Sequence, residues 1–186
     1  MRVIAGALKG RRLRSPAWDG LRPTSDKLRE TLFNILAPRI DGARLLDGYA
    51  GTGAIGIEAI SRGARWVSFV DSDRRAQALI AENLGHCGVT NGYVIIRATV
   101  AVALDDLGIA PSGDRGLFDI IVLDPPYDEP QIDAVMAAAG DVLAADGVLV
   151  LEHARRRDAP GAAGRLARLR QVTSGDSALS FYSCPP

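Results

Sequence analysis

The sequence predicts an α/β fold in which helices cover both faces of a parallel β-sheet. Strand-like segments are apolar along their whole length, which is typical of strands buried on both faces. Helical segments alternate with these strands, and this order favours repeated β-α units. Three of the strand-like segments end at an aspartate, namely Asp47, Asp71 and Asp124. Ligands of such sheets bind beyond the carboxyl ends of the strands, so these aspartates are candidate site residues.

Each expected element has its own signal. A helix is expected at 24–36, because Thr24 can cap it, apolar residues recur at helical spacing and Pro38 ends it. Short apolar runs predict strands, whereas longer runs with helical periodicity predict helices. After the first helix we expect strands at 45–47, 66–71, 93–96, 117–123 and 147–151, and helices at 55–60, 74–84 and 132–143. Two more apolar segments, 166–172 and 178–182, predict a terminal hairpin.

The composition is that of one soluble domain: 186 residues, of which 47% are hydrophobic and 24% charged. No apolar run approaches the ~18 residues that a membrane helix needs, and the N-terminus does not resemble a signal peptide. We therefore expect a cytoplasmic protein. Cys87 and Cys184 have neither metal-site spacing nor the pattern of a disulfide scaffold. Both are expected to be reduced thiols, and no metal site is predicted.

The formal net charge of zero hides an uneven distribution. Residues 1–39 contain nine Lys or Arg residues and three Asp or Glu residues, a net charge of +6, so the remainder carries −6. If strands at 2–5 and 11–14 pair, the cations around Gly10 would project from a basic β-ribbon that suits nucleic-acid phosphates. These cations are Lys9, Arg11, Arg12 and Arg14. A solvated surface with scattered counter-charges is the alternative.

The glycine-rich segment after the first strand predicts a cofactor site. Gly51-Thr52-Gly53-Ala54-Ile55-Gly56 matches G-x-G-x-x-G, and Asp71 follows Gly51 by 20 residues, as in dinucleotide-binding folds. A nicotinamide-dependent oxidoreductase is therefore one interpretation. Asp47 opposes it, because a carboxylate there would repel a pyrophosphate but attract the sulfonium and ammonium groups of S-adenosylmethionine. The candidate cofactor-binding residues here are Asp47, Ala50, Gly51, Gly53 and Asp71.

The segment Asp124-Pro125-Pro126-Tyr127, directly after an apolar strand, is the most informative feature of the chain. An exocyclic amine on a nucleobase is a poor nucleophile, because its lone pair is delocalised into the ring. The Asp124 carboxylate and the Pro125 carbonyl can hold both amine hydrogens, and two prolines keep the segment stiff. Tyr127 offers a face on which an extruded base can stack. The segment predicts amine methylation, and a plain proline-rich turn is the alternative.

Several segments, in chain order, resemble the RsmD family of bacterial 16S ribosomal RNA guanine-N2 methyltransferases: MRVIAGALKGRRL, LRPTSDKLRETLFNIL, LLDGYAGTGAIGIEAISRGA, FDIIVLDPPY, VLVLEHA and SALSFYS. The resemblance covers nearly the whole chain. It implies a Rossmann-like, seven-stranded S-adenosylmethionine-dependent methyltransferase fold in residues 23–186, with an N-terminal β-hairpin extension in residues 1–22. It also implies S-adenosylmethionine as donor and a guanine of small-subunit ribosomal RNA as acceptor. Thr99 stands near the position where related methyltransferases often place an acid that binds the adenine amine.

The proposed chemistry assigns roles to the remaining candidates. We expect Lys9, Arg11, Arg12 and Arg14 to hold RNA phosphates, and Arg22, Lys27 and Arg29 to flank the cleft. The expected partner is 16S ribosomal RNA or a 30S assembly intermediate, bound by a monomer that is not attached to a membrane. Glu152 and His153, near the end of the fifth strand, can line the cleft without a catalytic role. The alternatives are a DNA adenine-N6 or protein-amide methyltransferase, an NAD-dependent oxidoreductase and a cofactor-free nucleic-acid binding module.

Overall fold

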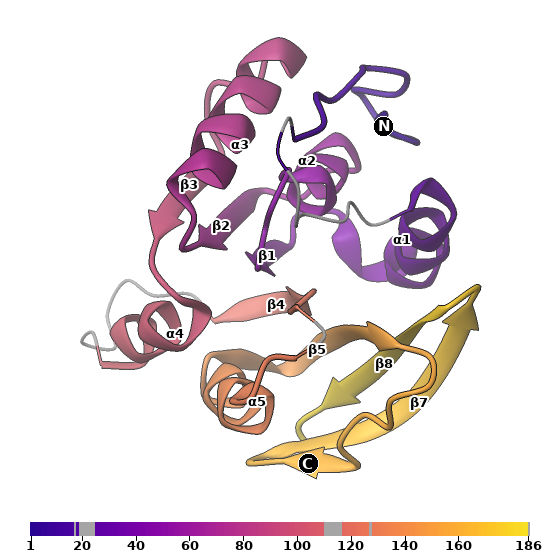
Figure 1. Ribbon diagram of the computed structural model, residues 1–186, viewed down its shortest axis with the longest axis vertical. Helices are drawn as coiled ribbons and strands as arrows, with labels where there is room; N and C mark the ends of the chain where they lie inside the picture. The colour runs from indigo at the N-terminus through magenta and orange to yellow at the C-terminus, as the bar shows by residue number, and fades with distance from the viewer. Residues whose placement is uncertain (17, 19–24, 110–116, 127, 186) are drawn as a thin grey trace.

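An eight-stranded β-sheet runs through the molecule in the order β3-β2-β1-β4-β5-β8-β7-β6 (Figure 1). The computed structural model describes residues 1–16, 18, 25–109, 117–126 and 128–185. Strands β1 to β5 pair in parallel, and β8, β7 and β6 extend the sheet in antiparallel pairs. The strands are β1 (Arg44–Gly48), β2 (Trp66–Asp71), β3 (Tyr93–Arg97), β4 (Phe118–Leu123), β5 (Leu143–Ala154), β6 (Ala162–Ala163), β7 (Leu166–Ser174) and β8 (Ser177–Ser183). The predicted α/β class is confirmed, and the short β6 makes the number of strands eight rather than seven.

Helices cover both faces of this sheet (Figure 1). On one face α1 (Asp26–Ile40), α2 (Ala54–Ser61) and α3 (Arg74–Cys87) share an apolar cluster that includes Val122 and Val150. On the other face α4 (Val100–Ile109) and α5 (Ile132–Asp141) share a second cluster, which includes Leu123 and Leu151. Successive residues of a strand point to opposite faces, so each central strand needs apolar residues throughout.

Three helix features differ from expectation. α1 is capped by Ser25, whose hydroxyl accepts the Leu28 N–H at 3.2 Å; Thr24, the predicted cap, lies outside the described residues. α1 also continues past Pro38 to Ile40, since a proline near the end removes few helical bonds while Ile40 is buried. α4 was not expected at all. It is mostly apolar and lacks the polar stripe that marks an amphipathic helix in a sequence.

The N-terminal segment folds back on itself as a loose hairpin. Arg2 and Arg12 form an isolated antiparallel bridge, so the two regular strands expected at 2–5 and 11–14 are absent from this described segment. Backbone bonds join Val3 N–H to the Arg11 carbonyl at 2.9 Å and Leu13 N–H to the Met1 carbonyl at 3.1 Å. Val3 and Leu13 are buried in the first apolar cluster. The segment therefore contributes to the core of the methyltransferase domain; residue 22 lies outside the described residues, so the division there stays a prediction.

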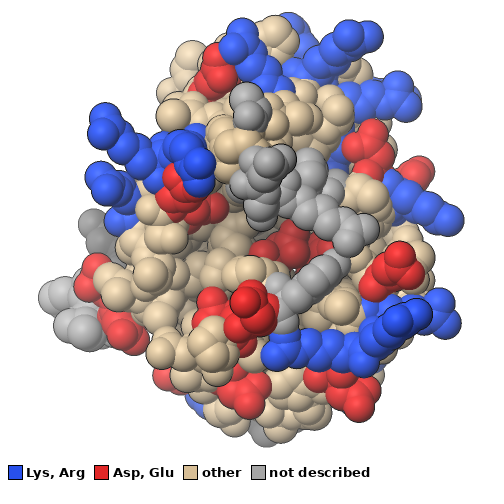
Figure 2. Space-filling model, in the orientation of Figure 1, with Lys and Arg blue, Asp and Glu red and all other residues tan. Residues whose placement is uncertain are grey.

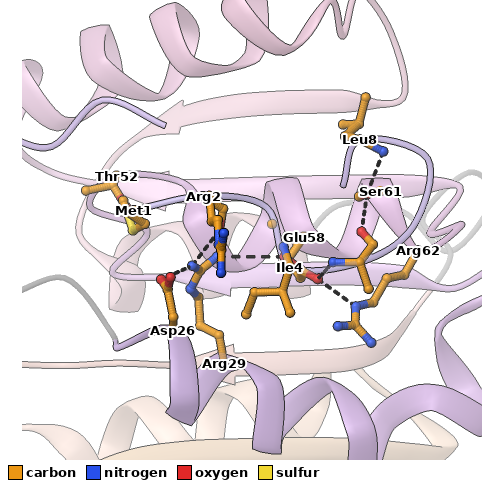
Figure 3. A network of polar contacts seen from close by, with 12 residues as sticks. Met1, Arg2, Ile4, Leu8, Asp26, Arg29, Thr52, Glu58, Ser61 and Arg62 are labelled. Carbon is orange, nitrogen blue, oxygen red and sulfur yellow. Dashed lines mark hydrogen bonds and ion pairs between the residues drawn. The ribbon is translucent and has the colours of Figure 1, made fainter. Parts of the chain in front are cut away.

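A buried carboxylate fixes this segment to α2 (Figure 3). Glu58 is fully buried and accepts the Ile4 N–H at 2.7 Å and the Ala5 N–H at 3.0 Å. Arg62, the residue that directly follows α2, donates from Nε to the same carboxylate at 2.7 Å. The Glu58 side chain thus takes the place of a strand partner for the N-terminal backbone.

The Arg29 side chain is part of the same network and is also fully buried (Figure 3). Its Nη2 donates to the Arg2 carbonyl at 2.8 Å and to the Asp26 carboxylate at 2.7 Å, and its Nη1 lies 3.8 Å from the Glu58 carboxylate. A guanidinium with no exposure cannot reach an RNA phosphate. The prediction that Arg29 flanks the cleft as a nucleic-acid contact is therefore wrong, and Arg29 holds α1 against the N-terminal segment.

Neither cysteine forms a disulfide. Cys87 is buried in the first cluster, and Cys184 is partly buried beside the second. No helix within the described ranges combines the length and apolarity needed to cross a membrane.

Candidate active site

The three predicted aspartates lie on one cavity of about 820 Å³. Asp47 and Asp71 belong to the carboxyl ends of β1 and β2, and Asp124 follows β4. These three strands are adjacent in the sheet, which brings residues far apart in the sequence to the same edge. Figure 2 shows acidic side chains at the bottom of a hollow in the centre of one face. The structure thus brings the predicted donor and acceptor residues together.

The glycine loop between β1 and α2 is tied to both strand-end aspartates. Asp71 accepts the Gly51 N–H through Oδ2 at 2.9 Å and the Asp73 N–H through Oδ1 at 2.8 Å. Asp47 accepts the Gly56 N–H at 2.9 Å. The Gly53 N–H donates to the Ala50 carbonyl at 2.7 Å. The loop amides at Gly51 and Gly53 therefore already have hydrogen-bond partners within the protein.

Two glycines of this loop and of α2 have structural roles. A Cβ on Gly56 would lie 2.2 Å from the Phe69 ring, so only glycine lets α2 approach β2 this closely. Gly53 has a φ of 75° and precedes the first residue of α2, a conformation that favours glycine. It is absent from the described lining of the cavity, whereas Ala50 and Gly51 are part of it. Gly53 therefore shapes the loop rather than facing a ligand.

The cavity favours a cation. Asp47 is 1% exposed, and burial raises the pKa of its carboxyl well above the ordinary value. The Gly56 N–H opposes this shift, and the negative charges of Asp124 and Asp71 add to it. A positively charged ligand beside Asp47 would favour its ionised form, whereas a pyrophosphate would add to the repulsion. This electrostatic environment suits a sulfonium or an ammonium and disfavours a dinucleotide.

The acceptor side of the cavity is built from several elements. Asp124 and Pro125 are half-buried, and the Asp124 N–H donates to the Gly48 carbonyl at 3.3 Å, which continues the β1–β4 pairing by one residue. Tyr127 and Arg22 lie outside the described residues, so their predicted roles stay predictions. Other residues that line this side are Ser25, Lys27 of α1, Glu129, Gln131, Glu152 and the β7–β8 turn at 174–177.

The other predicted residues fall into two groups. Thr99 lines the cavity, but its hydroxyl accepts the Val102 N–H at 3.3 Å and so supports the first turn of α4. Lys9, Arg11, Arg12 and Arg14 are exposed on the N-terminal segment, away from the described cavity lining. Arg14 forms an ion pair with Glu82 of α3.

Tyr49 is a cavity residue that the sequence did not identify as functional. It has a φ of 63°, a left-handed conformation that is uncommon for a bulky side chain, and its hydroxyl donates to Glu129 at 3.3 Å. Burial and the nearby Glu129 carboxylate raise the pKa of Tyr49. The bond links the turn after β1 to the segment after Asp124. The sequence signal is its place directly after Asp47-Gly48, at the edge where ligands bind.

Comparisons with known proteins agree with this geometry. Residues 1–183 match the family described as Conserved hypothetical protein 95. The Ribosomal RNA small subunit methyltransferase D of Escherichia coli (strain K12) is 31% identical over 184 residues, covering 98% of this chain and 89% of that protein. This chain belongs to the RsmD family. A second relative, YlbH of Bacillus subtilis (strain 168), is 38% identical to this chain, and the alignment covers 98% of each protein.

Solved structures place this RsmD-family chain among methyltransferase folds. The Escherichia coli protein yhhF aligns with a TM-score of 0.81 at 30% identity, covering 100% of this chain and 99% of that chain. A more distant methyltransferase, SMU.776 complexed with SAH, shares the fold with a TM-score of 0.68 at 15% identity, covering 88% of this chain and 51% of that one. The predicted methyltransferase fold is confirmed, and membership of the RsmD family favours methyl transfer over the oxidoreductase interpretation.

Proposed function

We propose that the protein transfers a methyl group from S-adenosylmethionine to the exocyclic N2 amine of a guanine in 16S ribosomal RNA. The observation that carries this proposal is the single cavity on which Asp47, Asp71 and Asp124 lie together. The name of the Escherichia coli relative supports ribosomal RNA as the substrate class. The amine target rests on the stiff Asp124-Pro125-Pro126 segment.

On the donor side, Asp47 would face the α-ammonium group and Asp71 the ribose hydroxyls. Each Asp71 oxygen accepts one backbone N–H, which fixes the carboxylate and leaves acceptor capacity for a hydroxyl. When bound, S-adenosylmethionine supplies an electrophilic methyl group on a positively charged sulfur. The Asp47 and Asp71 carboxylates would orient that group by holding the ammonium and ribose parts of the same molecule.

On the acceptor side, the Asp124 carboxylate and the Pro125 carbonyl would accept the two N2 hydrogens of a base swung out of its stack. Held in this way, the amine directs its lone pair at the methyl carbon. The N–C bond forms as the C–S bond breaks, the electron pair of that bond stays on sulfur, and one proton leaves N2 afterwards. No metal or covalent nucleophile is needed, because alignment supplies most of the acceleration.

The competing functions use the same chemistry on other amines. Adenine N6 of DNA and the amide nitrogen of a protein side chain could also be held by Asp124 and Pro125. A direct test is transfer of a tritiated methyl group from S-adenosylmethionine to free 16S RNA, to 30S subunits and to 50S subunits from cells that lack the protein. Nucleoside analysis should find N2-methylguanosine in small-subunit RNA. Label in 6-methyladenine, in protein or only in 50S subunits would contradict the proposal.

Replacing Asp47 with asparagine should weaken S-adenosylhomocysteine binding and raise the melting temperature of the ligand-free protein. Burial raises the pKa of this carboxyl, so ionising it at neutral pH destabilises the fold, while an amide oxygen can still accept the Gly56 N–H. Affinity should fall about 10- to 100-fold, as expected for one charge-assisted hydrogen bond. Calorimetric titration and thermal unfolding measure the two effects, with the exposed Asp105→Asn as control.

In the wild-type protein, a change of pH should shift the stability of the ligand-free fold and the affinity for S-adenosylhomocysteine in opposite directions. Because the pKa of Asp47 is raised in the folded state, the folded protein binds more protons than the unfolded chain between the unfolded and the folded pKa. Ligand-free stability should therefore fall as pH rises through that window. S-adenosylhomocysteine affinity should rise over the same range, since the ionised carboxylate attracts the ammonium. Equal affinity of Asp47→Asn and wild type at neutral pH would remove Asp47 from the donor site.

The exposed cations of the N-terminal segment should govern RNA affinity. Replacing Lys9, Arg11 and Arg12 with alanine should raise the RNA Michaelis constant and make it less dependent on salt. The slope of log affinity against log salt concentration should become shallower by roughly 0.7–0.9 for each lost phosphate contact. Arg14 is left in place because it is paired with Glu82. The control replaces three exposed arginines outside this segment, Arg65, Arg74 and Arg97. A loss of S-adenosylhomocysteine affinity in the first variant would instead indicate a structural role.

A further inference from the structure

Glu152 lies beside Asp124 at the edge of the sheet. β4 and β5 pair in parallel with Leu123 opposite Leu151, so the residues that follow, Asp124 and Glu152, are neighbours across the strands. Neighbouring strands lie about 4.8 Å apart. Both residues line the cavity, and Glu152 is only 7% exposed. A second carboxylate thus stands next to the one that we assign to the N2 amine.

Both carboxylates belong to the face of the sheet that α1 covers. Val122 and Val150, two residues earlier on each strand, lie in the apolar cluster shared with α1. Side chains two residues apart on a strand point the same way, so Asp124 and Glu152 follow the direction of these valines. Lys27, in the first turn of α1, lines the same cavity. On this part of the acceptor side, the Asp124 and Glu152 carboxylates and the Lys27 ammonium group therefore line the same space.

We propose that Glu152 selects guanine by accepting the N1–H of its Watson–Crick edge, with Lys27 donating to O6. This inference rests on the function proposed above and names the groups that read the base. Guanine offers hydrogens at N2 and N1 and an acceptor at O6, which complement the acceptors Asp124 and Glu152 and the donor Lys27. Adenine offers an acceptor at N1 and an amine at C6. It would place its N1 lone pair against the buried Glu152 carboxylate and its amine against the Lys27 ammonium.

The burial of Glu152 makes this discrimination strong. Water can separate a mismatched base acceptor from an exposed carboxylate and so reduce their repulsion. Glu152 is only 7% exposed, so this repulsion would remain. Sites built to hydrogen-bond a particular substrate group reject analogues that lack it far more strongly than sites that sense shape alone. Flipped bases are read in this way, by hydrogen bonds to the Watson–Crick edge.

The test changes the target base in the RNA as well as the Glu152 side chain. The target nucleotide is first located by the position of the methyl group in RNA treated with the wild-type protein. RNA is then assembled by ligation with guanosine or with 2,6-diaminopurine riboside at that position. The diaminopurine keeps the N2 amine, but it has an acceptor at N1 and an amine in place of O6. For the wild type, kcat/KM should fall at least about 100-fold on the diaminopurine RNA.

For Glu152→Gln, kcat/KM on guanosine RNA should exceed kcat/KM on diaminopurine RNA by less than about 10-fold. An amide can donate to the N1 acceptor of diaminopurine and can also accept from guanine N1–H. Glu129→Gln, a matched change at another carboxylate of the cavity, should preserve the wild-type ratio. S-adenosylhomocysteine affinity should be unchanged in Glu152→Gln, which checks that the variant is folded.

The outcomes separate this inference from the proposed function. If the wild-type product carries no N2-methylguanosine, the proposed function itself is wrong. If it does, and the wild type methylates diaminopurine RNA as fast as guanosine RNA, the selection of guanine at N1 is overturned without the need for any variant. A folded Glu152→Gln variant that keeps the full wild-type ratio would overturn the assignment to Glu152 while leaving the function intact.

Discussion

Replacing Asp124 with alanine should abolish methyl transfer while leaving the affinity for S-adenosylhomocysteine within a few-fold of wild type. The carboxylate is assigned to an amine that is present only when RNA is bound, so its loss removes alignment of the attacking nitrogen. Losses of about 10²- to 10⁴-fold are expected when one positioned transition-state contact is removed. Asp124→Asn should be milder, because the amide oxygen still accepts one N2 hydrogen.

The rate must be measured in a single turnover with both substrates saturating, so that weaker RNA binding does not imitate a chemical defect. Asp128→Asn is the matched control, because it removes the same charge from an exposed residue outside the described cavity lining. If Asp124→Ala methylates RNA at the wild-type rate, the acceptor site lies elsewhere and the assignment of Pro125 fails with it.

Replacing Glu58 with alanine should cost about 3–5 kcal/mol of unfolding free energy, the range observed when one partner of a buried ion pair is removed. The change would remove one of the two carboxylates beside the buried Arg29 guanidinium, leaving only Asp26, and would leave the Ile4 and Ala5 N–H groups without this acceptor. Equilibrium urea unfolding gives the free energy, provided that the transition is two-state.

The surface ion pair between Arg14 and Glu82 supplies the comparison for this prediction. Both side chains are largely exposed, so Glu82→Ala should change the unfolding free energy by no more than about 1 kcal/mol. Glu58→Gln should fall between the two variants, since it retains one acceptor oxygen. If Glu58→Ala and Glu82→Ala are equally stable, the buried network is not what fastens the N-terminal segment.

The central sheet was predictable because burial on both faces demands apolar strands, and this demand leaves a strong local pattern. The strand-end aspartates were predictable for the same reason, since adjacent parallel strands bring their carboxyl ends together. α4 was not predicted because its mostly apolar sequence has no polar stripe of the kind that marks an amphipathic helix.

The burial of Arg29 could not be predicted from local sequence. An arginine in a helix is ordinarily exposed. Asp26, one turn earlier, is a local partner, but the burial of Arg29 also depends on the distant Arg2 carbonyl and on Glu58, 29 positions later. The same holds for the N-terminal segment. Its cations indicated a projecting ribbon, but Val3 and Leu13 anchor it in the core. Contacts between distant residues decide both cases, and the sequence gives no pattern for them.

The β7–β8 turn at 174–177 lines the acceptor side of the cavity, whereas the donor side is built chiefly from residues 47–72 and 98–101. During synthesis the donor side can therefore form from early, mostly local β-α units, well before the last hairpin has emerged. The acceptor side needs that hairpin and β5. A nascent chain should be able to retain the cofactor before it can enclose a base, so methylation competence should follow only once β5, β7 and β8 have been synthesised.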